Sequence, residues 1–425
     1  MAEATAPKRP DGFAAYVAVT AAYWAFMLTD GALRMLVLLH FHTLGFSPIQ
    51  LAYLFLLYEF MGVVTNLSAG WIAARFGLTS TLYAGLSIQV VALLALAQLD
   101  PAWSILSSVI FVMAVQGASG VAKDLAKMSS KSAVKILAPQ DQKGALFRWV
   151  ALLTGSKNAV KGFGFLIGAV LLGVIGFESA VLGMAIALAL ILAATVIFMP
   201  GGLPQGRKSA KFSEVFSKDR QVNMLSAARL FLFGARDTWF VVGIPIYFYS
   251  VLSDGSVESN RTAFFLIGTF MAIWIIGYGF IQARAPKLLK AQDKTVEETV
   301  SLAGLWAAVL FTIPLVLAAC SLLAAETNPP PIWLTIVLVT GLLAFGAVFA
   351  INSSLHSYLI LAFTNAQRVT MDVGFYYMSN AAGRLFGTLV SGLSFQIGGL
   401  ALCLFCSAAM LGAALVFTHR LARGG

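Results

Sequence analysis

Charged residues are scarce in this sequence: they make up 11% of its 425 residues, where a soluble protein carries roughly a quarter. Cysteine is rarer still. Cys320, Cys403 and Cys406 all lie in apolar runs, which excludes a disulfide framework, and Cys403-x-x-Cys406 has no further ligands that would complete a metal site. The sequence also lacks HExxH and GxSxG motifs and a phosphate-binding glycine loop. These absences argue against an enzyme and predict no cofactor or metal.

Hydrophobic residues make up 59% of the chain and fall in long runs. A helix needs about 20 apolar residues to cross a bilayer, and helices are expected because a lipid-exposed open strand leaves backbone groups unpaired. The net charge of +10 would suit a nucleic-acid binder, but the basic residues lie mainly between the apolar runs, and no nucleic-acid partner is predicted. The runs predict an all-α polytopic membrane protein with spans near 13–40, 48–73, 79–98, 102–127, 146–174, 179–199, 222–250, 261–283, 299–323, 332–360, 371–397 and 400–419.

Lysine and arginine fix the predicted orientation, because basic residues concentrate in cytoplasmic segments. With a cytoplasmic N-terminus, Arg261 is the only basic residue in the external loops, and a slip of one span would scramble this sorting. The sequence therefore predicts a multi-pass protein of the inner (plasma) membrane with cytoplasmic N- and C-termini. The external loops instead collect the acids Asp100, Glu178, Asp254, Glu258 and Glu326.

A polar stretch rich in glycine, proline and lysine divides the chain into two halves. It predicts a six-helix bundle over 1–199, a cytoplasmic loop over 200–221 and a second bundle over 222–425, the parallel-repeat plan of the major facilitator fold. Residues 156–166 (SKNAVKGFGFL) also resemble residues 379–389 (SNAAGRLFGTL) at an offset of 223, which aligns Lys161 with Arg384. Gly176 and Gly399 keep the same offset, so the halves are predicted to be internal repeats.

Charged side chains inside the spans indicate the charge of the solute. Each charge at the bilayer centre costs about 2.5–3.5 kcal/mol, so these residues should face a wet cavity between the halves. The mid-span acids are Asp30, Glu59, Asp124 and Asp237. They are fewer than the mid-span cations, and the positive surplus predicts an anionic substrate. The cations are Arg34, Lys123, Lys157, Lys161, Arg229, Arg236 and Arg384.

Internal ion pairs are the alternative reading of these charges. Asp30 with Arg34, Asp124 with Lys127, and Asp237 with Arg236 have the spacing for it. Span five contains no acid, however, so Lys157 and Lys161, together with Arg384, are predicted to face the substrate path unpaired. Arginine suits phosphate because its planar fork donates two parallel hydrogen bonds.

The candidate site follows from these charges and their polar neighbours. Asp30 and Glu59 are candidates for proton coupling, although an inter-helical hydrogen bond would explain Glu59 equally well. Tyr377 and Asn380 precede Arg384 on one span and could add hydrogen bonds, with aromatic packing as the alternative. The substrate-binding candidates are Arg34, Lys123, Lys157, Lys161, Arg236, Tyr377, Asn380 and Arg384.

Longer blocks of sequence resemble the organoarsenical efflux permeases of arsenic-resistance operons, the ArsJ branch of the major facilitator superfamily. The likeness runs from about residue 16 to residue 415. It is carried by YWAFMLTDGALRMLVLLHFHTLGFSP (23–48), KDLAKMSSKSAVKIL (123–137), LLTGSKNAVKGFGF (152–165), LSAARLFLFGARDTWFVV (225–242), INSSLHSYLI (351–360) and DVGFYYMSNAAGRLFGTLVSG (372–392).

The resemblance implies a secondary efflux transporter that exports 1-arseno-3-phosphoglycerate by alternating access and so confers arsenate resistance. It also implies a functional partner, a glyceraldehyde-3-phosphate dehydrogenase that makes this ester when arsenate replaces phosphate. The alternative is efflux of another organophosphate or a drug by the same fold. A membrane-embedded sensor or enzyme would bring a signalling domain or a catalytic cluster, and the sequence shows neither. The sequence leaves the oligomeric state open, and a monomer is expected.

Overall fold

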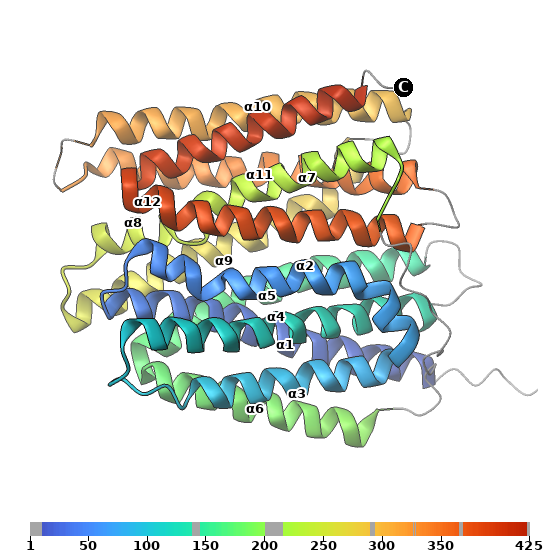
Figure 1. Cartoon of the computed structure of the whole chain (residues 1–425), viewed down its shortest axis with the longest axis horizontal. Coiled ribbons are helices and arrows are strands. Elements are labelled where there is room, and N and C mark those ends of the chain that lie inside the picture. The colour runs from blue at the N-terminus through green and yellow to red at the C-terminus, as the bar shows by residue number, and fades with distance from the viewer. Residues whose placement is uncertain are drawn as a thin grey trace, which may run out of the picture.

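The computed structural model describes residues 11–137, 145–199, 216–289, 294–325, 327, 329–364 and 369–422. Every regular element in these residues is a helix, and the helices run along one long axis of the molecule (Figure 1). In chain order they are α1 (Asp11–Thr43), α2 (Pro48–Phe76), α3 (Leu78–Leu96), α4 (Ile105–Leu137), α5 (Ala145–Ile175), α6 (Phe177–Phe198), α7 (Arg220–Phe240), α8 (Gly243–Leu252), α9 (Val257–Leu288), α10 (Val296–Leu323), α11 (Ile332–Phe363) and α12 (Val369–Ala422).

The described helices make twelve crossings of the bundle. Eleven helical stretches are long and apolar enough to span a membrane, and one of them combines α7 and α8 as Arg220–Leu252. The last, Asp372–Leu421, contains two crossings, because Gly398 and Gly399 leave helical geometry and α12 folds back on itself there (Figure 1). The prediction of an all-α polytopic membrane protein with twelve spans is therefore confirmed.

Local sequence signals set where several helices begin. The Asp219 side chain accepts a hydrogen bond from the Val222 amide at the start of α7, and Ser256 accepts one from Ser259 at the start of α9. Thr295 and Glu298 form a reciprocal capping box at the start of α10. Each cap pairs backbone N–H groups that a helix N-terminus leaves without partners, so the polar turns between spans also act as helix starts.

The two ends of the bundle differ in charge. One end, called the basic end below, carries seven described cations against the three acids Asp219, Glu297 and Glu298; the cations are Arg75, Lys218, Arg220, Arg284, Lys287, Lys294 and Arg420. The opposite end carries Asp100, Glu178, Asp254 and Glu258 together with Arg261. Because successive helices alternate in direction, this sorting follows the predicted alternation of loops between two sides of a membrane.

Helices α1–α6 pack mainly among themselves, as do α7–α12, and two pairs of helices join these halves: α2 with α12 and α5 with α9. Glycines allow the close approach between halves. A Cβ atom on Gly392 of α12 would lie 2.6 Å from the Pro48 carbonyl oxygen of α2, and one on Gly268 of α9 would lie 2.7 Å from the Ala169 Cβ of α5. Two six-helix halves are thus confirmed, while the boundary at 200–221 falls mostly outside the described residues and stays a prediction.

Glycines at matching positions support the internal repeat. Gly176 and Gly399 have φ angles of 79° and 60°, a conformation that favours glycine, and both begin a reversal of the chain. Gly164 and Gly387, also 223 residues apart, lie where α5 crosses α1 and α12 crosses α7. A Cβ atom there would approach a backbone carbonyl oxygen, of Leu28 and of Gly234, to 2.4 and 2.3 Å. The halves therefore share both a turn and a helix crossing.

Replacing Gly387 with alanine should destabilise the folded protein. The added methyl group has no space beside the Gly234 carbonyl, so α7 and α12 must separate, and overpacking of this kind costs about 1–3 kcal/mol. Gly183→Ala is the matched control, because a Cβ atom at that helical glycine meets nothing within 4 Å. Thermal denaturation in detergent should show a lower Tm for Gly387→Ala only. Equal Tm values would contradict the tight crossing.

Candidate functional site

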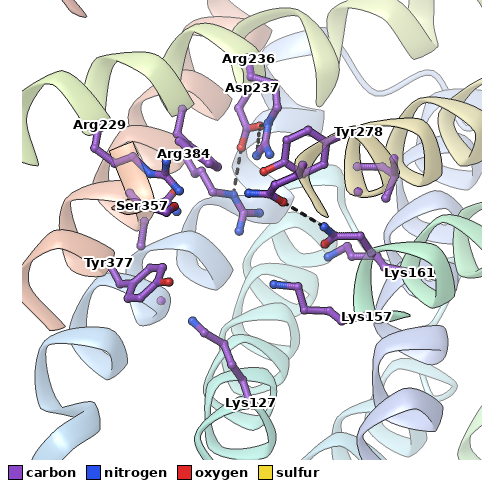
Figure 2. A pocket seen from close by; sticks show the side chains of 18 of the residues that line it. Lys127, Lys157, Lys161, Arg229, Arg236, Asp237, Tyr278, Ser357, Tyr377 and Arg384 are labelled. Carbon is purple, nitrogen blue, oxygen red and sulfur yellow. Dashed lines mark hydrogen bonds and ion pairs between the residues drawn. The ribbon is translucent and has the colours of Figure 1, made fainter. Parts of the chain in front are cut away.

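A cavity of about 670 Å³ lies between the two halves. Its lining comes from α1, α2, α4 and α5 of one half and from α7, α9, α11 and α12 of the other. The lining residues run from the middle of these helices, at Arg34 and Arg384, to the basic end, at Leu289 and Leu361. Figure 2 shows Lys127 and Lys157 reaching into this space, with Arg229 and Arg384 beyond them.

Side chains from both halves meet between the cavity and the opposite end. His42 at the end of α1 packs edge-on against Tyr249 of α8, with ring centroids 4.7 Å apart. Deeper in the bundle, Phe165 and Phe240 lie 6.2 Å apart and both line the cavity. The cavity therefore reaches toward the basic end, while the halves are in contact beyond it.

The structure gathers the predicted site residues in one place. All eight substrate-binding candidates line this cavity, as does Glu59. Asp30 lies just behind the lining, where its carboxylate accepts hydrogen bonds from Lys161 at 2.7 Å and from the Tyr58 hydroxyl at 2.5 Å. The sequence thus predicted which charges come together, and their role in binding stays a prediction. The eight candidates are Arg34, Lys123, Lys157, Lys161, Arg236, Tyr377, Asn380 and Arg384.

The expected pairing of these charges was partly wrong. Lys161, predicted to be unpaired, forms an ion pair with Asp30 of α1 at 2.7 Å. Arg384, also predicted to be unpaired, contacts Glu59 at 2.5 Å and Asp237 at 3.2 Å. Arg34 pairs with Glu59 at 2.9 Å and not with Asp30 one helical turn away. The helices pack side by side, so carboxylates on neighbouring helices lie closer to these cations than any carboxylate on the cation's own helix.

Two of the pairs expected within a helix are present. Lys127 contacts Asp124 at 3.1 Å, and Arg236 contacts Asp237 at 2.5 Å. Because Arg384 touches both Glu59 and Asp237, five charged residues form one chain of contacts that crosses between the halves. Its order is Arg34, Glu59, Arg384, Asp237, Arg236.

The cavity keeps a positive surplus despite these pairs. Eight described lining residues carry positive charge and three carry negative charge, with Asp30 as a fourth acid behind the lining. The surplus is therefore four charges, larger than predicted, because Lys127 faces the cavity and not the membrane interface. Buried positive charge in excess of buried carboxylate favours a bound anion.

Sequence reasoning did not select several polar lining residues. Lys127 lies at the end of the predicted span 102–127, which suggested an interfacial side chain, but α4 continues to Leu137 and places Lys127 inside the helix. Arg229 was counted among the mid-span cations without a role in binding. Asn158 and Gln282, which hydrogen bond to each other at 3.4 Å across the halves, gave no charge signal at all. His356 is buried but is not a lining residue. The same helix, α11, contributes Ser354 and Ser357 to the lining.

The described residues offer little to a metal ion. No group of three or more histidine, cysteine or acidic side chains in the described ranges could hold one. Cys403 packs against Ser391 and Ser394, and none of the three cysteines is among the lining residues. The polar groups that line the cavity offer charge and hydrogen bonds to a solute.

A membrane-spanning bundle of two six-helix halves around a central polar cavity defines a secondary transporter. The sequence matches the model of the Major Facilitator Superfamily over residues 15–387, and the chain belongs to that superfamily. The chain is also similar to the crystal structure of a mutant of the nucleoside transporter NupG, with a TM-score of 0.65 and 15% identity over 96% of this chain and 98% of that one. No curated protein matches by sequence. The protein is a transporter and not an enzyme.

Proposed function

We propose that this transporter exports an anionic organoarsenical, 1-arseno-3-phosphoglycerate, and thereby confers arsenate resistance. The observation that supports this most is the surplus of four positive charges around a cavity of about 670 Å³. A solute with a phosphate at one end and an arsenate ester at the other is strongly anionic and matches that surplus. The resemblance to organoarsenical permeases supplies the identity of the solute, and the cavity supplies the charge that would hold it.

Export is the direction that the resemblance to efflux permeases implies, and the orientation proposed for the bundle is compatible with it. If the basic end faces the cytoplasm of the inner membrane, with both termini on that side, the cavity is accessible to an ester made in the cytoplasm. A partner glyceraldehyde-3-phosphate dehydrogenase would supply the ester. Trivalent arsenite fits less well, because it favours thiolates, and no described cysteine lines the cavity.

Growth on arsenate tests this function directly. Cells lacking their own arsenic export should tolerate arsenate only when the transporter and the partner dehydrogenase are expressed together. Expression of the transporter alone should give no protection, because no ester is made. Protection without the dehydrogenase, or against arsenite alone, would contradict the proposed substrate.

Glu59 is the better placed of the two coupling candidates. One carboxylate oxygen accepts hydrogen bonds from Arg34 of its own half and from Arg384 of the other half, at 2.9 and 2.5 Å, while its second oxygen is buried without a partner among the described residues. Of the two candidates, Glu59 is the one whose carboxylate contacts a cation of the other half, so a change at Glu59 acts directly on the link between the halves. Proton entry could therefore drive export, with phosphate exchange as the alternative.

Everted vesicles separate these two driving forces. With an acidic lumen, the wild-type protein should accumulate the ester, and dissipating the pH gradient should remove that accumulation. Glu59→Gln should be insensitive to the gradient, because its amide does not change charge. Accumulation that instead requires phosphate in the lumen would assign the coupling to exchange and not to Glu59.

A further inference from the structure

Arg229 stands apart from the other arginines of the cavity. It lies on α7, is only 3% exposed, and lines the cavity. Its Nη1 donates to the carbonyl oxygen and the hydroxyl of Ser353, at 3.1 and 2.9 Å, and its guanidinium lies 4.1 Å from the centre of the Phe233 ring. Within the described ranges it forms no ion pair, whereas Arg34, Arg236 and Arg384 each contact a carboxylate. A buried cation without a counter-charge is costly, so this position favours an anion.

The groups around Arg229 are neutral and rich in donors. The Tyr278 hydroxyl lies 3.5 Å from the Ser353 hydroxyl, and the Gln282 amide donates to the same hydroxyl at 3.4 Å. Ser357 donates to the Ser353 carbonyl at 2.9 Å. The Arg229 subsite is defined here as Arg229, Tyr278, Gln282 and Ser357, the four of these residues that line the cavity. In Figure 2, Arg229 lies beside Ser357 on the far side of the cavity from Lys157.

This donor set suits a tetrahedral oxyanion. Nη1 of Arg229 is occupied by Ser353, which leaves the parallel pair of Nε–H and Nη2–H, and Nε has no partner among the described residues. Two such parallel donors match two oxygens of a phosphoryl or arsonyl group, and the Tyr278 hydroxyl and Gln282 amide can serve the third oxygen. No carboxylate belongs to the subsite, so nothing in it repels the anion. Arg384, in contrast, already contacts Glu59 and Asp237, and a substrate would have to compete with both.

The opposite half carries a matching cation. Lys123 of α4 is 8% exposed, lines the cavity, and forms no ion pair with a described carboxylate. Its ammonium lies 4.0 Å from the centre of the Tyr58 ring, which stabilises the charge without neutralising it. Arg229 and Lys123 thus line one cavity from different halves, and each has a positive charge that no described carboxylate contacts as an ion pair.

Resting on the proposed function, we infer that the Arg229 subsite binds a tetrahedral oxyanion and that Lys123 binds the second anionic end of the substrate. Free phosphate shares the chemistry of the first end, so it should occupy the Arg229 subsite by itself. The Arg229 subsite therefore selects solutes that carry a phosphoryl-type group, and Lys123 selects solutes that carry a second negative charge.

Binding to the full-length protein in detergent tests the two ends separately, with inorganic phosphate and 3-phosphoglycerate as stable probes in isothermal titration. Arg229→Gln should weaken both probes by about tenfold to a hundredfold, the effect of losing a charged hydrogen-bonding partner. Lys123→Gln should weaken 3-phosphoglycerate about tenfold and phosphate less than twofold. Arg220→Gln is the control, since it removes an arginine from the same helix at an exposed position outside the cavity.

The outcomes distinguish the subsite from the proposed function. If the unmodified protein binds neither probe, the subsite fails, while growth on arsenate with the partner dehydrogenase decides the proposed function separately. If the unmodified protein binds both probes and Arg229→Gln binds them with affinities within twofold of it, only the subsite is wrong. If Lys123→Gln loses as much affinity for phosphate as for 3-phosphoglycerate, the assignment of the two ends is wrong. Should Arg229→Gln fail to fold, Tyr278→Phe and Ser357→Ala carry the test, with a loss of at least threefold for both probes expected. No loss in either variant would contradict the subsite.

Discussion

Arg384→Ala should reduce export by a hundredfold or more at unchanged protein level. The guanidinium contacts Glu59 of α2 at 2.5 Å and Asp237 of α7 at 3.2 Å, and so joins two carboxylates from different halves. Arg34 and Arg236 still contact these carboxylates, so neither is left without a counter-charge and the fold should persist. The positive surplus of the cavity falls from four to three, and the ion-pair link between the halves is lost.

Arg384→Lys is the informative companion variant. It keeps the charge, but a single ammonium cannot reproduce a planar fork that reaches both carboxylates, so intermediate activity is expected. Initial rates of ester uptake into everted vesicles, normalised to transporter content, measure the effect. Uptake by Arg384→Ala within twofold of the wild-type rate would show that this arginine is outside the transport path.

Lys161→Ala should also abolish export. A second variant that also replaces its partner Asp30 separates a loss of folding stability from a loss of anion binding. The Lys161 ammonium contacts Asp30 at 2.7 Å, and Asp30 is buried, so the alanine variant leaves a bare carboxylate in the bundle. The double variant Asp30→Asn with Lys161→Gln removes both charges and keeps hydrogen-bonding groups, which should restore the Tm. Export should remain lost, because the cavity still lacks one of its cations.

Thermal denaturation and vesicle uptake, measured on the same preparations, decide between the two roles. Recovery of the Tm without recovery of uptake shows that the Asp30–Lys161 pair does more than stabilise the fold. Uptake that persists in Asp30→Asn alone, which keeps Lys161, would assign that role to Lys161 and not to Asp30 as a coupling residue. If the double variant transports as well as the wild type, Lys161 only neutralises Asp30, and the role predicted for it in binding is wrong.

Apolar run length was enough to predict the spans, because the bilayer requires a fixed length of helix. Details that depend on local geometry were missed. The predicted span 222–250 is interrupted between α7 and α8 at Val241 and Val242, directly before Gly243 and Pro245. A proline fits the first turn of a helix but not its interior, so this signal was present and reasoning from run length alone passed over it. The predicted span 261–283 is the longer helix Val257–Leu288, because polar residues continue the helix beyond the apolar run.

Charge alone predicted which charged residues line the cavity, but it did not predict which of them form ion pairs with one another. Counting mid-span charges depends only on depth along each helix, and that reasoning placed Lys157, Lys161 and Arg384 together correctly. Which carboxylate meets which cation depends on how neighbouring helices pack, and spacing along one helix favoured Arg34 for Asp30. Neutral groups such as Tyr278 and Gln282 were missed because they carry no charge that marks them within an apolar span.

The central claim is that the cavity selects anions, and everted vesicles test it most directly. Vesicles offered equal concentrations of the arseno-ester, 3-phosphoglycerate and a lipophilic cation should accumulate the ester fastest, 3-phosphoglycerate more slowly, and the cation not at all. Preferential accumulation of the lipophilic cation, with neither anion transported, would contradict the account.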